Sequence, residues 1–320
     1  MKKNHQIKWI LFHSPVEIFV RTAESFAKEI GELTNGRINI EVYKIEDYAK
    51  KFNDGVFVDP VSLLKSNEVQ MSQIQTNWLG HADATDFYAL DMPFLFKSHA
   101  HCSRVLEGPI GESMLDSLPS KTKSLRGLAF TYSGGYRCVA SKEPITSVEG
   151  FHGLSFAVRT NPVAYDMAKS FGTAPAVIDD LVLETRKDQG EKFDAVQTTL
   201  PRYEAQINSD VHPYIINTRH NMFLTTILVN EQFWQDLDIE DQLLMKQAAL
   251  NASRQERQWS IDDAKKIETD ADEQKRLGIK EVLEFPETER EKLRTVTKEV
   301  YKKYDNVFTP GLLDSILKAE

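Results

Sequence analysis

Two arginines lie on or at the ends of predicted strands in the middle of the chain. Arg137 falls within the segment 136–140, and Arg159 ends the segment 153–159. A charged side chain in such a place is costly unless it is paired. Each guanidinium could close a structural ion pair, or it could hold a ligand carboxylate through two parallel N–H···O bonds. The residues therefore predict either structural ion pairs or an anion-binding site.

Other side chains could complete a small-ligand pocket around these arginines. Trp78 and Tyr132 could supply apolar walls and Thr198 a hydroxyl, which is the usual make-up of such a pocket. Together with Phe223, these two aromatic residues favour a ligand with an apolar or ring portion. Plain core packing is the commoner role of each aromatic residue taken alone.

The sequence contains no catalytic constellation with a specific spacing. It lacks HExxH, GxSxG, GxGxxG and Walker-type motifs. Cys102 and Cys138 form no CxxC and favour two buried free thiols, and the pair His99 and His101 favours chance over a metal site. We therefore predict no metal, no cofactor and no enzymatic activity.

The elements that must position these residues begin with a predicted β-α-β unit. Residues 7–13 form a short apolar run, and residues 37–42 alternate polar and apolar side chains. Between them, apolar residues recur at helical spacing: Phe19, Ala23, Phe26 and Ile30. A short helix begins at 63–64, and a further strand is predicted at 69–74. Because loops at the carboxyl ends of parallel strands form the ligand crevice, we expect His13, Asn77 and Trp78 at the same edge.

The middle of the chain continues the pattern of an α/β sheet. We expect strands at 125–132 and 136–140 joined by a turn at 133–135, and a third strand at 153–159. Asn161 and Pro162 open a helix, since proline suits the first helical turn. A short strand is predicted at 193–196, and residues 197–199 would leave it as a loop.

A long helix is predicted near the end of the chain. Residues 238–277 contain no Pro or Gly, and Gly278 stands where a C-terminal cap belongs. About 40 residues would give ~60 Å of helix, which is enough to touch two domains. A break near Ser260 would restore ordinary lengths, and a coiled coil is an alternative that the polar segment 251–258 disfavours.

Length and charge set the class of protein. The 320 residues suggest about two domains, and the net charge of −9 argues against a general binder of nucleic acids or anionic membranes. Residues 1–8 have the positive start of a signal peptide, but the apolar stretch 9–12 is shorter than the usual ~7–15 residues. Either the protein is cytoplasmic, or it is a mature chain whose leader was replaced by a start Met.

Ordered motifs along the chain resemble the solute-binding proteins of TRAP transporters, the DctP family. The resemblance rests on segments 34–37 (TNGR), 90–96 (LDMPFLF), 104–111 (RVLEGPIG), 133–137 (SGGYR), 144–147 (PITS), 151–154 (FHGL), 158–159 (VR), 172–175 (GTAP) and 233–237 (FWQDL). Each motif is weak alone, but their order and spacing over roughly 10–310 are specific.

The resemblance implies a fold and a partner. The fold would be α/β, a two-lobed periplasmic-binding-protein clamshell with hinge strands and one long helix spanning both lobes. We expect residues 1–130 plus 214–260 in lobe 1 and residues 131–213 plus 261–320 in lobe 2. The protein would be periplasmic and monomeric, would bind no nucleic acid, and would deliver a small organic acid to the small and large TRAP membrane subunits.

The resemblance also assigns site residues. The family's carboxylate-holding arginine falls on Arg159, the Gly-aromatic-Arg arginine on Arg137, and the polar residue after the late Asp-Gly strand on Thr198. The family's usual Asp-Gly-Gln-Glu-Asn reads Asp-Ala-Val-Gln-Thr at residues 194–198. A hydroxyl therefore replaces an amide at Thr198, and the identity of the bound acid stays open. The predicted ligand-binding residues are Arg159, Arg137, Thr198, Trp78, Asn77, His13, Tyr132 and Phe223.

These residues would act together only when the clamshell closes. Arg159, Arg137 and Thr198 are expected on one lobe, and His13, Asn77 and Trp78 on the other, so a bridging ligand would favour the closed form. Two alternatives stay open. The same clamshell could act as a ligand sensor that docks to a receptor, or the chain could be a hydrolase acting on an acidic substrate, which the missing catalytic motifs disfavour.

Overall fold

The computed structural model describes residues 3–11, 17–57, 59–179 and 186–319. Within these ranges the strands are β1 (His5–Leu11), β2 (Ile38–Lys44), β3 (Met71–Gln75), β4 (Leu125–Ser141), β5 (Ser155–Val158), β6 (Ala174–Val177), β7 (Ala195–Thr199), β8 (Tyr214–Asn217), β9 (Met222–Asn230) and β10 (Glu281–Glu284). The helices are α1 (Glu17–Leu33), α2 (Ile45–Phe52), α3 (Pro60–Lys65), α4 (Trp78–His81), η1 (Thr85–Asp91), α5 (His99–Glu107), α6 (Pro109–Thr122), η2 (Glu149–Phe151), α7 (Pro162–Ser170), α9 (Asp188–Glu191), η3 (Leu200–Arg202), α10 (Tyr203–Gln206), α11 (Glu231–Gln235), α12 (Ile239–Thr269), α13 (Ala271–Arg276), α14 (Glu287–Val296), α15 (Lys298–Tyr304) and α16 (Leu312–Lys318).

One mixed sheet runs through both lobes of the molecule. Its strand order is β2-β1-β3-β9-β4-β7-β5-β6, with β8 beside β4 and β10 beside β8. β1 is parallel to β2 and β3, and β5 is parallel to β6 and β7, whereas β9 is antiparallel to β3 and β4. The predicted β-α-β unit is confirmed, because α1 connects the parallel pair β1 and β2 and buries Phe19, Ala23, Phe26 and Ile30.

A single long strand joins the two lobes, so the predicted turn at 133–135 is wrong. β4 runs from Leu125 to Ser141, pairing with β9 over its first part and with β7 and β8 over its second. Gly134 and Gly135 have φ angles of 94° and 72° and lie in a register shift between Tyr132 and Gly135. The glycines therefore form a bulge that bends one continuous strand, and a bulge has the same Gly-Gly pattern as a turn.

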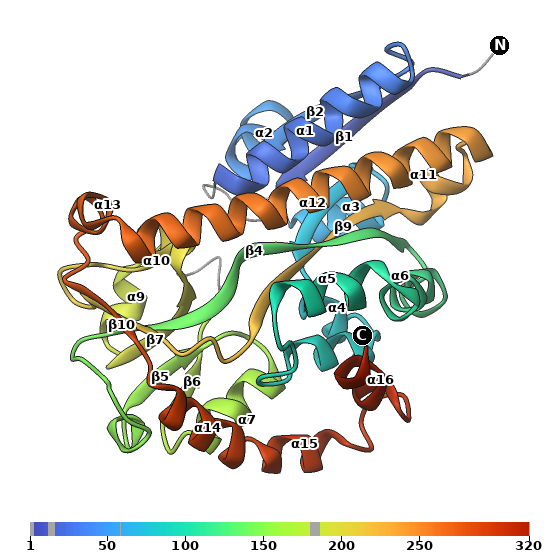
Figure 1. The fold of residues 1–320 in the computed structure, drawn as a ribbon. Helices are drawn as coiled ribbons and strands as arrows, with labels where there is room; N and C mark the ends of the chain where they lie inside the picture. The colour runs from blue at the N-terminus through green and yellow to red at the C-terminus, as the bar shows by residue number, and fades with distance from the viewer. Residues whose placement is uncertain (1–2, 12–16, 58, 180–185, 320) are drawn as a thin grey trace.

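The long helix spans both lobes, as predicted, but it is shorter. α12 has 31 residues, and the Asp270 side chain ends it by accepting the N–H groups of Asp272 and Glu273 as the N-cap of α13. Met245 and Ala248 pack with the α1 side of the core, whereas Ile267 packs with a separate cluster that includes Tyr203. Figure 1 shows the helix, in orange, crossing the molecule. The break thus lies at Asp270 and not near Ser260.

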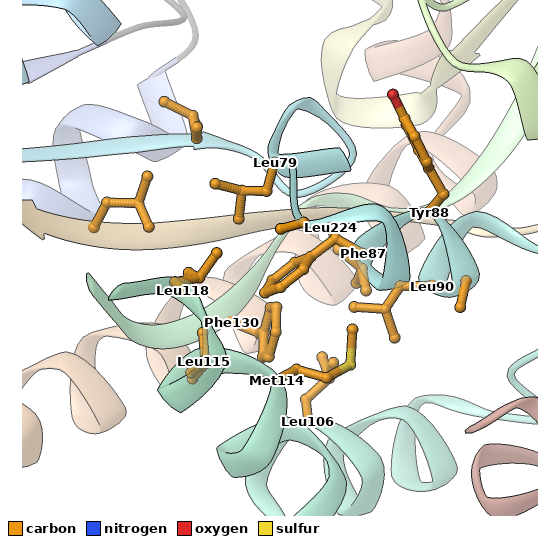
Figure 2. Close-up of a cluster of buried hydrophobic side chains, with 14 of the residues drawn as sticks. Leu79, Phe87, Tyr88, Leu90, Leu106, Met114, Leu115, Leu118, Phe130 and Leu224 are labelled. Carbon is orange, nitrogen blue, oxygen red and sulfur yellow. The ribbon is translucent and has the colours of Figure 1, made fainter. Parts of the chain in front are cut away.

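The core of the first lobe holds η1 in place (Figure 2). The rings of Phe87 and Phe130 lie 5.9 Å apart, with Leu106 and Met114 beneath them. Tyr88 belongs to the same cluster, but its hydroxyl points away from the other labelled side chains. The buried side of η1 therefore fixes the position of Tyr88 and of the end of this helix.

Two smaller predictions need adjustment. The short helix α3 begins at Pro60, where Asp59 caps it, and not at Leu63. β8, whose residues were expected in lobe 1, pairs with β10 and with the second part of β4. We therefore propose that the second segment of lobe 1 begins after Asn217, while the rest of the predicted division stays a prediction.

Candidate ligand-binding site

Arg159 lies directly after β5 and its side chain is buried, with 1% exposure. Its Nη2 atom donates hydrogen bonds to the carbonyl oxygen of Gln197 and, at 2.9 Å, to Oε1 of Gln206. The same Oε1 atom accepts a hydrogen bond from Oγ1 of Thr198 at 3.0 Å. The structure thus brings Arg159 and Thr198 together around one glutamine.

Thr198 belongs to a strand and not to the loop that the sequence suggested. β7 extends to Thr199, and all its residues are buried. The polar run Gln197, Thr198 and Thr199 resembled a loop because buried strands are usually apolar. Here hydrogen bonds hold two of these side chains, since Nε2 of Gln197 contacts Nε2 of His220 at 2.8 Å and Thr198 bonds Gln206.

Arg137 is also buried, with 2% exposure, and it packs on Phe223. Its guanidinium carbon lies 4.1 Å from the centroid of the Phe223 ring, a cation–π contact. The guanidinium carbon of Arg202 lies 4.7 Å from the same ring and 5.9 Å from the ring of Phe19 in α1. Phe223 therefore sits in a cationic cluster that reaches the first lobe through Phe19.

Arg137 and Thr198 leave opposite faces of the sheet. The antiparallel register pairs Arg137 with Thr199 and Cys138 with Thr198, and side chains alternate along a strand. The Arg137 side chain therefore starts on the face that Thr199 shares, and Thr198 starts on the other. The predicted site residues Arg137 and Thr198 therefore flank the carboxyl end of β7 from its two faces.

His220 lies close to Arg137 and stays neutral. Burial, assisted by the charge of Arg137, lowers the pKa of His220 to about 3. Its Nε2 faces Gln197 and its Nδ1 lies 2.7 Å from Oγ1 of Thr218. With Nε2 of Gln197 as the donor, Nδ1 of His220 carries the proton. His220 therefore adds no positive charge beside Arg137 at neutral pH.

Two of the three predicted first-lobe residues, Asn77 and Trp78, follow the carboxyl end of β3. Asn77 is buried and precedes α4, and Trp78 is half-buried with Nζ of Lys65 5.4 Å from its ring. No hydrogen bond or ring contact joins Asn77 or Trp78 to Arg137 or Arg159 within the described part of the chain. His13 lies outside the described residues.

Tyr132 lies against His99 of α5 and belongs to the core of the first lobe. The centroid of its ring lies 5.4 Å from that of His99. The ring of Tyr136 makes an edge-to-face contact with the same histidine, with the centroids 4.8 Å apart. Burial, together with the neighbouring Cys102 thiol, raises the pKa of Tyr132. Tyr132 therefore serves as a core residue of the first lobe in this structure.

Sequence reasoning missed the residues that hold the arginines. Gln206 carried no signal, because glutamine in a short helix is usually exposed, yet its exposure is 1%. Arg202 follows a buried strand just as Arg159 does, so the same signal could have found it. The helix predicted to open at Asn161 and Pro162 is confirmed as α7, and Oδ1 of Asn161 caps it by accepting the N–H of Val163.

The remaining chemical candidates are structural. Cys102 and Cys138 are both free and buried, as predicted, and burial raises the pKa of each thiol to about 12. Over the described ranges, no cluster of His, Cys, Asp or Glu is suited to hold a metal ion. None of the described helices is both long and apolar enough to cross a membrane.

Comparison with known proteins identifies the family. Residues 12–306 match the family of bacterial extracellular solute-binding proteins, family 7 (DctP). The solute-binding protein RD1_1052 of Roseobacter denitrificans is 27% identical over 73% of this chain and 69% of its own length. The C4-dicarboxylate-binding protein DctB of Bacillus subtilis is 21% identical over 92% of this chain and 81% of its own length.

A solved structure confirms the clamshell fold. A TRAP periplasmic solute-binding protein from Polaromonas, bound to D-erythronate, superposes with a TM-score of 0.84 at 21% identity and covers 99% of both chains. The match to the family spans nearly the whole chain and agrees with the fold. The chain therefore belongs to the bacterial extracellular solute-binding proteins of family 7, which are binding proteins and not enzymes.

Proposed function

We propose that this protein captures a small organic acid between its two lobes and delivers it to the two membrane subunits of a TRAP transporter. The observation that supports this most is the pair of buried arginines, Arg159 and Arg137, at the carboxyl end of β7. Open α/β sheets bind ligands at this position.

Arg159 would hold the ligand carboxylate. Oε1 of Gln206 accepts hydrogen bonds from both Arg159 and Thr198. These bonds would orient the Arg159 guanidinium before a ligand binds. A fixed planar fork suits a carboxylate, because two parallel N–H···O bonds form with little further ordering. Arg137, held on Phe223, would meet the remainder of the ligand.

Closure would strengthen the contact. With the lobes closed, Asn77 and Trp78 of the first lobe would cover the ligand, and exclusion of water lowers the effective dielectric around the ion pair. Because only the closed form makes both sets of contacts, the ligand shifts the population toward it.

The relatives support the ligand class. One relative is named for C4-dicarboxylates and one related structure holds D-erythronate, and both compounds are small organic anions with a carboxylate. We extend the class to this chain, together with a periplasmic location and a monomeric state.

A thermal-shift screen of organic acids tests the proposal. A bound acid should raise the melting temperature, since binding at 100 times Kd stabilises the folded state by about 2.7 kcal/mol. Succinate and D-erythronate belong in the screen, with succinamide as a neutral control that lacks the charge. The proposed function would be contradicted if no carboxylate raised the melting temperature. It would also be contradicted if succinamide raised the melting temperature as much as the carboxylates do.

A further inference from the structure

The loop that follows Arg159 is held from the other lobe. Nε2 of His81 lies 3.0 Å from the carbonyl oxygen of Thr160. Nδ2 of Asn161 donates to Oδ2 of Asp91 at 2.5 Å. His81 ends α4 and Asp91 ends η1, so two groups of the first lobe grip the two residues next to the proposed ligand anchor.

In the contact between His81 and Thr160, Tyr88 holds the His81 imidazole in one orientation. The hydroxyl of Tyr88 lies 2.7 Å from Nδ1 of His81, and Figure 2 shows this hydroxyl pointing out of the hydrophobic cluster. A Cβ atom on Gly80 would lie 2.5 Å from the Tyr88 ring, so the glycine lets the ring pack directly on α4. Since a carbonyl only accepts, Nε2 of His81 carries the proton and Nδ1 accepts from Tyr88.

The second contact is buried and charged. Asp91 is 6% exposed and Asn161 is 3% exposed. Asn161 also caps α7 through Oδ1, and its N–H bonds the carbonyl oxygen of Arg159 at 2.7 Å. Asn221, just before β9, donates to the carbonyl oxygen of Asp91 at 3.1 Å. Asp91 therefore connects the loop after Arg159 to the segment that enters β9.

We propose that the Asp91–Asn161 and His81–Thr160 contacts form a latch that closes with the clamshell and fixes the backbone that carries Arg159. This inference rests on the proposed function, because the proposed function supplies the ligand that the latch would retain. Asp91, Asn161 and His81 act as positioning residues: they hold the loop and do not touch the ligand. Opening of the lobes would separate α4 and η1 from the loop and free the Arg159 backbone.

An exchange of the two side chains tests the latch. Asn161→Asp keeps an oxygen for the cap of α7, since aspartate caps as well as asparagine, but it places two carboxylates face to face. The double variant Asp91→Asn/Asn161→Asp restores one donor and one acceptor with the original net charge. Asn306→Asp, at an exposed position, is the matched control for the added charge.

Two measurements are made on the full chain. Spin labels at the exposed positions Lys50 and Lys169 report the distance between the lobes, and calorimetry with succinate and with D-erythronate reports affinity. Asn161→Asp should lengthen the distance and weaken binding about tenfold or more. The exchanged double variant should recover both, and Asn306→Asp should match the wild type.

The results separate the latch from the proposed function. Equal distance distributions in the wild type, Asn161→Asp and the double variant, with and without acid, would overturn the latch. So would an Asn161→Asp protein that loses thermal stability without acid but keeps its affinity, because the contact would then be permanent. A wild type that binds neither acid would contradict the proposed ligand class, and the distances without acid would still test the latch.

Discussion

The guanidinium carbon of Arg137 lies 4.1 Å from the centroid of the Phe223 ring. The two residues come from different strands, β4 and β9, which pair antiparallel at the bulge. Arg137 therefore depends on β9 for its orientation, and Phe223, which the sequence suggested as a ligand-binding residue, supports a charged side chain.

Phe223→Leu should weaken acid binding more than it destabilises the fold. Loss of the ring removes a cation–π contact of ~0.5–2 kcal/mol and leaves Arg137 less ordered. Phe26→Leu is the matched control, because Phe26 is equally buried but packs on Trp9. Calorimetry with the best acid of the screen should show reduced affinity for Phe223→Leu alone. Equal affinities in the two variants would exclude this role of Phe223.

Gly134→Ala should disrupt the bend of β4. A Cβ atom there would lie 2.2 Å from Oγ1 of Thr199, and the φ angle of 94° is unfavourable for alanine. Gly153 has a φ of 78° with no atom within 4 Å of a built Cβ, so Gly153→Ala isolates the conformational cost. In urea unfolding, Gly153→Ala should cost about 1–2 kcal/mol and Gly134→Ala a further ~1–3 kcal/mol. Equal costs would show that the contact with Thr199 relaxes freely.

Glu256 should make the stability of the protein fall as the pH rises. Burial raises the pKa of this carboxyl on α12 to about 8, although hydrogen bonds from Thr22, Gln73 and Thr131 and the charge of Arg21 oppose the shift. The folded state therefore keeps a proton that the unfolded chain releases near the ordinary glutamate pKa of 4.5. Between these values the free energy of unfolding should fall by about 1.4 kcal/mol per pH unit from this group.

Glu256→Gln isolates that effect. The amide keeps the size of the side chain, which lies 2.8 and 2.9 Å from Nε2 of Gln73 through its two oxygens, and it cannot ionise. Chemical denaturation of the wild type and the variant from pH 5 to 8 should show curves that diverge as the pH rises, with the variant gaining relative stability. Parallel curves would mean that Glu256 is already ionised in the folded protein.

The sequence predicted the parts of the fold that follow from periodicity. α1 was predicted from its apolar face at Phe19, Ala23, Phe26 and Ile30, and β1 and β2 from their short apolar and alternating runs. The long helix was located correctly because Pro and Gly are absent from it. Its end at Asp270 was missed, because an N-cap aspartate inside a charged helix looks like any other charged residue.

The errors share one cause, which is that local patterns do not reveal tertiary partners. Gly134 and Gly135 suggested a turn because nothing in the sequence shows that β9 continues past them. Gln197 and Thr198 suggested a loop because His220 and Gln206, which satisfy them, lie elsewhere in the chain. Arg159 was the most informative residue, since a charge at the end of a buried strand requires an explanation.

Isothermal titration calorimetry of Arg159 variants tests the central claim most directly. With the best acid of the screen, Arg159→Ala should lose about 2–5 kcal/mol of binding free energy, because one partner of a buried charge pair is removed. Arg159→Lys should also bind weakly, since an ammonium lacks the planar fork. Arg126→Ala, which removes an arginine paired with Glu231 far along the sheet, should bind like the wild type. The predicted result is weak binding in both Arg159 variants and normal binding in Arg126→Ala. Wild-type affinity in a folded Arg159→Ala protein would contradict the proposed role of Arg159.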